Sequence, residues 1–310
     1  MQREYIAKHL TPIIDEAKAT NDGSLDDEDF KKIQTYGLTV PAMLGEAFCK
    51  LRAVEITDKE HKAITFLASM TGLFDDLFDR KNVSENYILD LLDNPTMSDT
   101  TASNEKLLIN LYTQALENSD KQDTIKSQAL KVFYAQVASK RQNNGNLNRE
   151  EIQKITFDKG GVSMPFYRCA FDGEIDKAEY QMLYYLGAIG QLENDIFDIY
   201  KDYIAGIQTL ATIETNISNL QSAYRFLMDK ISELIDQTSY QPQNKQEFKL
   251  FANLVICRGL VGLDLLRRNA KRTQGVFSIT KYNRKDLICD MESPLNVLKL
   301  LHYAALCNKK

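Results

Sequence analysis

The sequence has few of the residues that interrupt regular secondary structure. It contains only 6 prolines and 14 glycines in 310 residues. Between them, apolar residues recur at intervals of three and four, which is the spacing of an amphipathic helix. Only the segment VFSITKY, at 276–282, favours a strand. We therefore predict an all-α fold.

Close cysteine pairs, clustered histidines and phosphate-binding loops are also missing. The five cysteines are odd in number and far apart, which argues against a zinc site or a disulfide framework and predicts a reduced, cytoplasmic location. The three histidines are isolated in the sequence, so a Ser-His-Asp arrangement is not supported. The glycine-rich motifs that cradle nucleotides do not occur.

Long apolar runs and an excess of positive charge are lacking as well. The first residues, MQREYIAKHLTPIIDEA, mix charged and apolar side chains and do not resemble a secretion signal. The most apolar later stretch, LVICRGLVGLDLL, is interrupted by Arg258 and Asp264, so no integral membrane segment is expected. A net charge of -5 argues against a nucleic-acid partner.

The composition is that of an ordinary globular protein, with 44% hydrophobic and 26% charged residues. The polar breaks between helical segments are short enough to be loops, so we predict one domain over residues 1–310. The predicted helices lie near 3–19, 40–56, 59–80, 84–93, 104–118, 122–141, 148–157, 162–171, 175–205, 207–238, 245–272 and 293–307.

The first acidic cluster is GLFDDLFDRK, at the end of the helix predicted for 59–80. Asp75 and Asp79 are spaced i and i+4, so they lie side by side on one face, with Asp76 next to them. Such like charges cost an isolated helix about 0.2–0.5 kcal/mol, and a helix C-terminus disfavours anions further. A bound Mg²⁺ would remove this penalty. A solvated acidic helix end is the alternative.

The second acidic cluster is GAIGQLENDIFDIYKD, near the end of the helix predicted for 175–205. Asn194, Asp198 and Asp202 follow one another at intervals of four and form a stripe. On the same helix face, Gly190 precedes Asn194 by four residues. In the first helix, Thr71 precedes Asp75 by four residues. If the two helices face each other, the acidic residues rim a cavity that holds a charged head and an apolar tail.

The two motifs together resemble the paired metal-binding motifs of class I isoprenoid synthases. The second stretch is similar to the terpene cyclase pattern N-D-x-x-S-x-x-K-E through Asn194, Asp195 and Lys201. It departs from the pattern at Asp198, where the family has Ser or Thr, and at Asp202, where it has Glu. Both replacements keep an oxygen ligand.

The second stretch also resembles the squalene and phytoene synthase pattern Q-x-x-N-x-x-x-D-x-x-x-D-x-x-x-G. The matching residues are Gln191, Asn194, Asp198, Asp202 and Gly206. A cyclase is preferred because its pattern matches more fully, and a head-to-head prenyl condensing enzyme is the alternative. A lapsed synthase or a non-catalytic helical scaffold is the alternative from another class.

The resemblance implies an isoprenoid-synthase-type helical bundle around a central cavity. It implies that the protein ionises an allylic isoprenoid diphosphate with three Mg²⁺ ions, releases diphosphate and forms a terpene hydrocarbon or alcohol. The implied metal ligands are Asp75, Asp76, Asp79, Asn194, Asp198 and Asp202, all but Asp76 also being assigned as catalytic. The implied cavity wall includes Thr71, Phe74 and Gly190, although aromatic residues at helical spacing are usually core.

Basic groups near the motifs are candidates for binding the diphosphate. Lys201 matches the family lysine, but an ion pair with Asp198 or Asp202 is the alternative. Arg80, which follows the first motif directly, and Lys159 are further candidates. The resemblance also implies Lys281 and Tyr282, which lie about where terpene cyclases carry an Arg-Tyr pair, with lysine in place of arginine. The assignment of Lys159 depends on a helix break that Gly160, Gly161 and Pro165 predict in FDKGGVSMPFYRC. No heptad pattern demands a partner chain, so a monomer and a homodimer both stay open.

Overall fold

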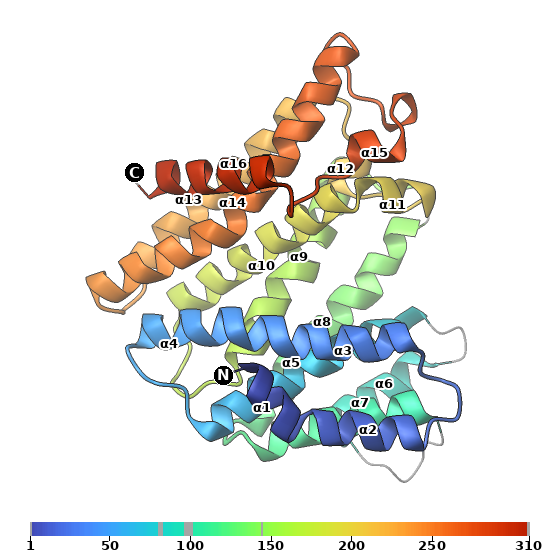
Figure 1. Ribbon diagram of the computed structural model, residues 1–310, viewed down its shortest axis with the longest axis vertical. Coiled ribbons are helices and arrows are strands. Elements are labelled where there is room, and N and C mark those ends of the chain that lie inside the picture. Colours follow the sequence, from blue (N-terminus) through green and yellow to red (C-terminus); the bar gives the residue numbers. More distant parts are fainter. Residues whose placement is uncertain (1, 80–82, 96–101, 144, 309–310) are drawn as a thin grey trace. The chain divides into compact units, whose positions relative to one another are not determined.

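Figure 1 shows the computed structural model, which describes residues 2–79, 83–95, 102–143 and 145–308. All regular elements in these ranges are helices, so the all-α prediction is confirmed. The segment 276–282, to which the sequence evidence for a strand was confined, contains a single 3₁₀ turn, Ile279–Lys281. None of the described helices combines the length and the apolar character that crossing a membrane requires.

The chain divides into two compact units. Unit 1 is Met1–Gln136 with Pro165–Glu174, and unit 2 is Val137–Met164 with Ile175–Lys310. Two of the three divisions fall inside helices, α8 (Gln122–Ser139) and α9 (Arg149–Arg168), and the third, after Glu174, lies between α9 and the next helix. Each unit is described by itself below, and the single domain over 1–310 stays a prediction.

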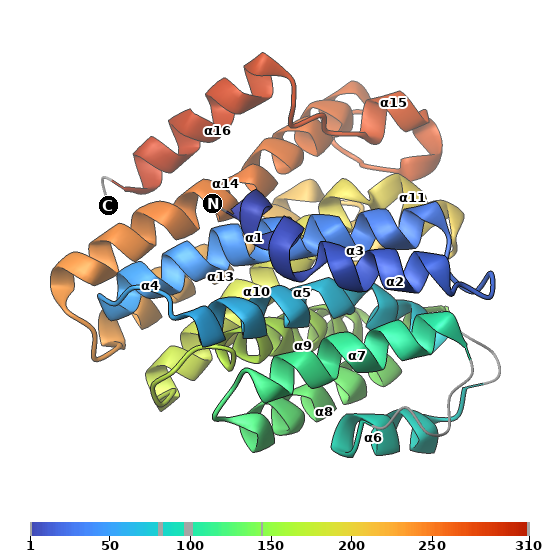
Figure 2. The ribbon, with the colours of Figure 1, turned by 60° about the horizontal axis from the view of Figure 1, so that its bottom comes forward.

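Unit 1 contains the helices of the N-terminal part of the chain. They are α1 (Gln2–His9), α2 (Thr11–Ala19), α3 (Asp27–Val40), α4 (Glu46–Arg52), α5 (Asp58–Asp79), α6 (Glu85–Asp93) and α7 (Ser103–Glu117). A π-helical turn, Pro41–Gly45, joins α3 to α4. Helix α5 packs against α3 and α7, as Figure 2 shows, so the helix that carries the first acidic cluster is the centre of this unit.

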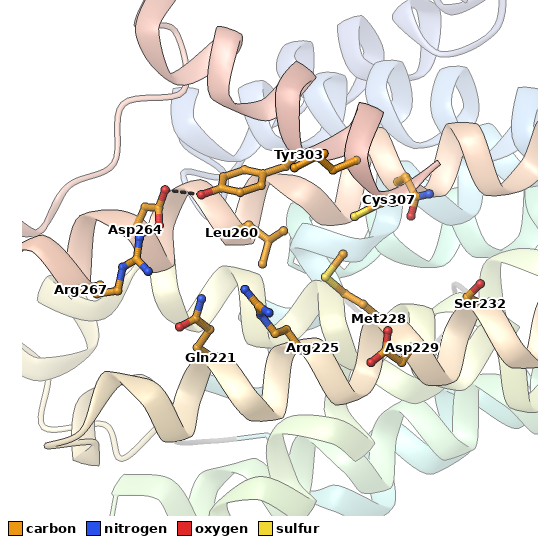
Figure 3. A pocket seen from close by; sticks show the side chains of 12 residues that line it. Gln221, Arg225, Met228, Asp229, Ser232, Leu260, Asp264, Arg267, Tyr303 and Cys307 are labelled. Carbon is orange, nitrogen blue, oxygen red and sulfur yellow. Dashed lines mark hydrogen bonds and ion pairs between the residues drawn. The ribbon is translucent and has the colours of Figure 1, made fainter. Parts of the chain in front are cut away.

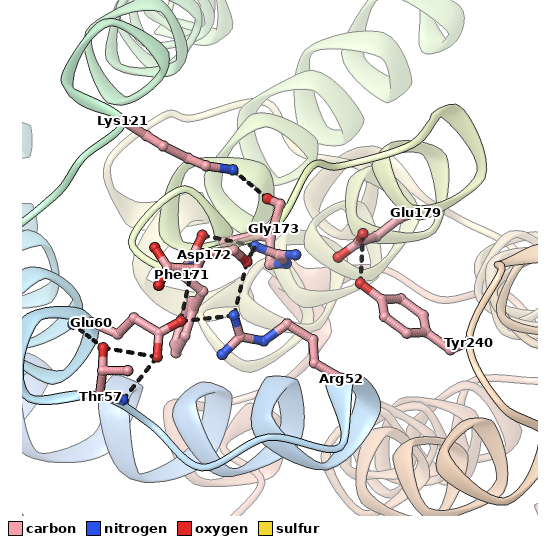
Figure 4. Close-up of polar contacts among 10 residues, drawn as sticks. Arg52, Thr57, Glu60, Lys121, Phe171, Asp172, Gly173, Glu179 and Tyr240 are labelled. Atoms are coloured by element: carbon pink, nitrogen blue, oxygen red, sulfur yellow. Dashed lines mark hydrogen bonds and ion pairs between the residues drawn. The ribbon is translucent and has the colours of Figure 1, made fainter.

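A buried charge network ties the segment Pro165–Glu174 to the rest of unit 1 (Figure 4). Arg52 donates hydrogen bonds to Glu60 Oε1 at 2.7 Å and to the Asp172 carbonyl at 2.8 Å. The backbone N–H groups of Thr57 and Asp172 also donate to Glu60, at 2.9 and 2.8 Å. The fully buried Arg168 donates to the Asp172 carbonyl at 3.2 Å. The Glu60 carboxylate is therefore buried with its charge compensated.

Unit 2 contains the C-terminal helices. They are α10 (Lys177–Phe197), α11 (Ile199–Ile204), α12 (Leu210–Ile213), α13 (Ile217–Gln237), α14 (Pro242–Arg272), α15 (Arg284–Leu287) and α16 (Pro294–Cys307). Helix α10 packs against α13 and α14, and α16 packs along α14. The buried Glu179 of α10 also accepts a hydrogen bond from the Tyr240 hydroxyl at 2.8 Å, drawn in Figure 4.

The helix break predicted around Gly160 and Gly161 is wrong, because α9 runs without interruption through both glycines and Pro165. A Cβ atom at Gly160 would overlap the backbone oxygen of Gly187 in α10, and one at Gly187 would overlap the Gly160 oxygen. A Cβ at Gly161 would overlap the Tyr184 ring. These glycines therefore allow two helix backbones to approach closely, and they do not end a helix.

We expect Gly160→Ala to destabilise the protein by about 1–3 kcal/mol, because the added methyl group meets backbone atoms that cannot rotate away. Gly190→Ala is the matched control, since Gly190 lies in α10 with nothing within 4 Å of the added Cβ. There alanine should stabilise the helix by up to about 1 kcal/mol. Denaturant unfolding followed by circular dichroism measures both changes. Equal effects of the two variants would contradict the close approach of α9 and α10.

Several helix boundaries also differ from those predicted. Helix α3 was not predicted, although Asp26 accepts hydrogen bonds from two backbone N–H groups at its start and forms a capping box with Asp29. The helix predicted for 175–205 is interrupted at Asp198, and that predicted for 207–238 is interrupted after Ile213. The second acidic cluster therefore spans the end of α10, the bend at Asp198 and the helix α11.

Candidate functional site

The second acidic cluster lies where α10 ends and α11 begins. The Asp198 N–H still donates to the Asn194 carbonyl at 2.8 Å, but Asp198 itself is a bend, with φ -90° and ψ 8°. Helix α11 ends at Ile204, and Gly206 follows it with a φ of +73°, which suits glycine. The Ile207 N–H donates back to the Asp202 carbonyl at 2.9 Å. Gly206, one of the matches to the condensing-enzyme pattern, is thus explained by a helix-terminating motif.

Asn194, Asp198 and Asp202 lie in successive turns at this end of unit 2, since the Asp202 N–H also donates to the Asp198 carbonyl, at 2.9 Å. Asn194 is exposed, and both carboxylates are half-buried. Burial, and then the charge of Asp198, raise the pKa of Asp202 to about 6, against the opposing effects of Lys201 and Lys159. Two carboxylates therefore repel each other in a place with limited access to water, where a cation would be stabilised.

Lys201 pairs with Asp198 at 3.6 Å, which is the surface ion pair that was the alternative to a diphosphate-binding role. Its side chain is 79% exposed, so the pair contributes little to stability and leaves the ammonium group accessible to a ligand. Lys159 of α9 is half-buried, and its charge partly opposes the burial that raises the pKa values of both Asp195 and Asp202. Its place beside this cluster therefore does not depend on the incorrect helix break.

Asp195 is buried and holds α10 to α9. Its carboxylate accepts hydrogen bonds from Gln191 Nε2 at 2.8 Å and from Thr156 Oγ1 at 3.1 Å. Burial raises the pKa of Asp195 to about 7. The contact with Thr156 was not predicted, because nothing in the sequence indicates which residue of α9 faces Asp195. Asp195 therefore fixes α10 against α9 next to the second cluster.

The first acidic cluster lies at the end of α5 in unit 1, and protein groups already contact its carboxylates. Asp75 accepts a hydrogen bond from Gln136 Nε2, and Asp76 pairs with Lys32 of α3 at 3.4 Å. Burial raises the pKa of Asp76, and Lys32 opposes this effect. The Asp79 side chain and the whole of Arg80 lie outside the described residues. Neither Gln136 nor Lys32 was predicted, because both come from distant parts of the sequence.

The three residues predicted for a cavity wall have different surroundings. Thr71 is half-buried, and its hydroxyl lies 2.8 Å from the Tyr167 hydroxyl. Phe74 is buried in unit 1 and packs edge-on against Phe78, with ring centroids 5.0 Å apart. Gly190 is exposed. Phe74 therefore packs in the core of unit 1, which was the alternative to its place in a cavity wall.

Lys281 and Tyr282 follow α14 in unit 2. Lys281 is exposed, whereas Tyr282 is buried, stacks on Phe277 and lies 2.6 Å from the Thr273 hydroxyl. The adjoining α15 contacts α11, the helix that carries Lys201. Lys281 thus belongs to a segment next to the second cluster, and Tyr282 is fixed within that segment.

No group of three or more His, Cys, Asp or Glu side chains in the described ranges is arranged to hold a metal ion. The second cluster offers only two carboxylates, together with the amide oxygen of Asn194. Mg²⁺ is commonly bound through one or two carboxylates, with water and substrate phosphate as its other ligands. The oxygen atoms that Asp198, Asp202 and Asn194 offer are of the kind that Mg²⁺ prefers, and a magnesium ion at this cluster stays a prediction.

Unit 2 also has a groove of about 350 Å³ between α13, α14 and α16, shown in Figure 3. We call it the α16 groove. Its lining residues are Gln221, Arg225, Met228, Asp229, Ser232, Asn253, Leu260, Asp264, Arg267, Tyr303, Leu306 and Cys307. The Tyr303 hydroxyl donates to Asp264, which also pairs with Arg267 at 3.0 Å. These lining residues include none of the predicted site residues.

Comparisons with known proteins give no match. Neither a scan against family models nor searches of curated proteins and of solved structures find a similar protein. The residues themselves therefore carry the argument about function. Asp75 and Asp76 belong to unit 1, and Asn194, Asp198 and Asp202 belong to unit 2. That the two clusters face a common cavity stays a prediction.

Proposed function

We propose that the protein is a Mg²⁺-dependent class I terpene synthase that converts an allylic isoprenoid diphosphate to a terpene hydrocarbon or alcohol. The observation that supports this proposal is the half-buried pair of Asp198 and Asp202. The pKa of Asp202 is raised to about 6, first by burial and then by Asp198. Such an arrangement costs stability in the protein alone and is favourable once a divalent cation binds.

Mg²⁺ would be held by Asp198, Asp202 and Asn194, and by Asp75 and Asp76 if the clusters share one cavity. When bound, it supplies positive charge that stabilises the diphosphate leaving group. Lys201, which is accessible, and Lys159, which is beside the cluster, would bind the diphosphate oxygens and keep the leaving group oriented. The aspartates act as ligands and need not transfer a proton.

A head-to-head prenyl condensing enzyme is the second candidate. The observation that favours it is that Asp198 carries a carboxylate where the cyclase pattern has a hydroxyl group. Two aspartates at intervals of four are the arrangement of the condensing-enzyme pattern. The two candidates use the same ligands and differ in product, because a condensing enzyme joins two substrate molecules.

The test is to incubate the purified protein with C10, C15 and C20 allylic diphosphates, with Mg²⁺ or with EDTA. Diphosphate release is followed, and the organic extract is analysed by mass spectrometry. We expect release only with Mg²⁺, together with a product that has the carbon number of its substrate. A product with twice that number would favour the condensing enzyme. Absence of release from all three substrates would favour a helical scaffold or a lapsed synthase.

A further inference from the structure

Two cysteine thiols from different helices are in contact in unit 2. The sulfur of Cys257 in α14 lies 3.7 Å from the sulfur of Cys307 in α16. The two helices pack against each other, and Figure 2 shows α16 next to α14. A disulfide bond brings its sulfur atoms to about 2.0 Å. Small side-chain rotations and a slight approach of the helices would close the remaining separation.

The two thiols differ in their access to solvent. Cys257 is fully buried, whereas Cys307 is half-buried and lines the α16 groove (Figure 3). Burial, and then the proximity of Cys307, raise the pKa of the Cys257 thiol. A small reagent in the groove therefore meets Cys307 first, and Cys257 is placed to react with the adduct.

The contact between the two thiols is important because α16 buries little surface against the rest of unit 2. Within α16, which the structure describes in full, only Ala304 is buried. Leu295, Leu298 and Leu301 are 71%, 62% and 51% exposed. Helix α14 is the main element against which α16 packs. A covalent link between these helices would restrain a segment that few apolar contacts restrain.

We propose that Cys257 and Cys307 form a redox site, at which a small disulfide such as oxidised glutathione converts the two thiols to a disulfide that fastens α16 to α14. The Cys307 thiolate attacks one sulfur of the small disulfide, breaks its S–S bond and releases one thiolate. Cys257 then attacks the Cys307 sulfur and releases the second thiolate, which takes up the Cys257 proton as it leaves. Two cysteines are oxidised, and the small disulfide is reduced to two thiols.

The test treats the full chain with oxidised glutathione or with a dithiol reductant, and maps the peptides by mass spectrometry without reduction. We expect a cross-linked pair of peptides that contain Cys257 and Cys307. We also expect amide hydrogen exchange in α16 to slow by at least about tenfold on oxidation, since the link limits local opening. Cys289→Ser is the matched control, because Cys289 is a half-buried thiol in the same unit, and it should leave both results unchanged.

Two variants separate the proposed link from other reactions of the thiols. Cys257→Ser should retain glutathione on Cys307, without a cross-link and without slower exchange in α16. Cys307→Ser, which alters the more exposed partner, should leave Cys257 unmodified. The proposal is overturned if the natural sequence stops at glutathione on Cys307, if the cross-link joins Cys289 or a second chain, or if neither thiol reacts.

Discussion

Asp202→Asn is expected to lower Mg²⁺-dependent diphosphate release by at least about 10²-fold, the typical effect of removing one group that stabilises charge in a transition state. Asparagine has nearly the same shape as aspartate but no negative charge, so it binds Mg²⁺ poorly. The measurement is the initial rate of diphosphate release with the best of the allylic substrates, at several Mg²⁺ concentrations. Excess Mg²⁺ should restore only part of the rate.

The same substitution is expected to raise the stability of the protein without Mg²⁺. The pKa of Asp202 is raised from 3.8 to about 6, so the folded protein holds the proton of this group more tightly than the unfolded chain. Its charge therefore costs folding stability in full above pH about 6, and this cost falls as the pH is lowered towards 3.8. The thermal midpoint of Asp202→Asn should exceed that of the natural sequence at pH 7, and the difference should vanish near pH 3.

Asp229→Asn is the matched control for both effects, because Asp229 is an exposed carboxylate of α13 in the same unit. It should change neither diphosphate release nor the thermal midpoint appreciably. Loss of activity together with loss of stability in Asp202→Asn would mean that Asp202 has a structural role only. Unchanged activity would contradict the assignment of this cluster to the metal.

Glu60→Gln is expected to destabilise the protein by about 3 kcal/mol, since it leaves the Arg52 charge without its buried partner. The side chains of Arg52 and Glu60 are only 8% and 4% exposed. Asp120→Asn is the matched control, because Asp120 pairs with Lys59 at 3.0 Å on the surface, with exposures of 76% and 63%. Breaking that pair should cost at most about 1 kcal/mol. Denaturant unfolding at pH 7 compares the two variants.

The Glu60 contribution should also depend on pH. Burial opposes ionisation of Glu60, but hydrogen bonds from Arg52, Thr57 and Asp172 outweigh it and hold the pKa of this carboxyl below its ordinary value of 4.5. Its stabilising effect is thus complete above pH 4.5 and is lost as the pH falls through the lower, folded-state pKa. The stability curve of Glu60→Gln should be flatter than that of the natural sequence in this acidic range. Parallel curves would contradict the assignment.

The helical class of the fold was predictable because it depends on the periodic spacing of apolar residues along each segment. The continuity of α9 was not predictable, because Gly160 is read as a helix breaker unless Gly187 is known to face it. Close backbone approach depends on a partner distant in sequence, which local patterns do not identify. The start of α3 had a local signal, the capping box of Asp26 and Asp29, but acidic residues so close together are also typical of a polar loop.

The candidate site was predictable to the extent that its residues are near one another in sequence. Asp198 and Asp202 are one helical turn apart, so their mutual repulsion follows from spacing alone. The depth of their burial does not, and burial is the larger cause of the raised pKa of Asp202. The partners of the first cluster, Lys32 and Gln136, come from other helices and needed the tertiary structure.

The division of unit 1 into two stretches of chain has a consequence for its synthesis on the ribosome. Residues 1–136 emerge first, yet the N–H and carbonyl groups of Asp172 that complete the charge network belong to a stretch made later. The intervening residues, 137–164, are part of unit 2. The nascent N-terminal half therefore lacks the Asp172 hydrogen bonds to Glu60 and Arg52 until residue 172 has left the ribosome.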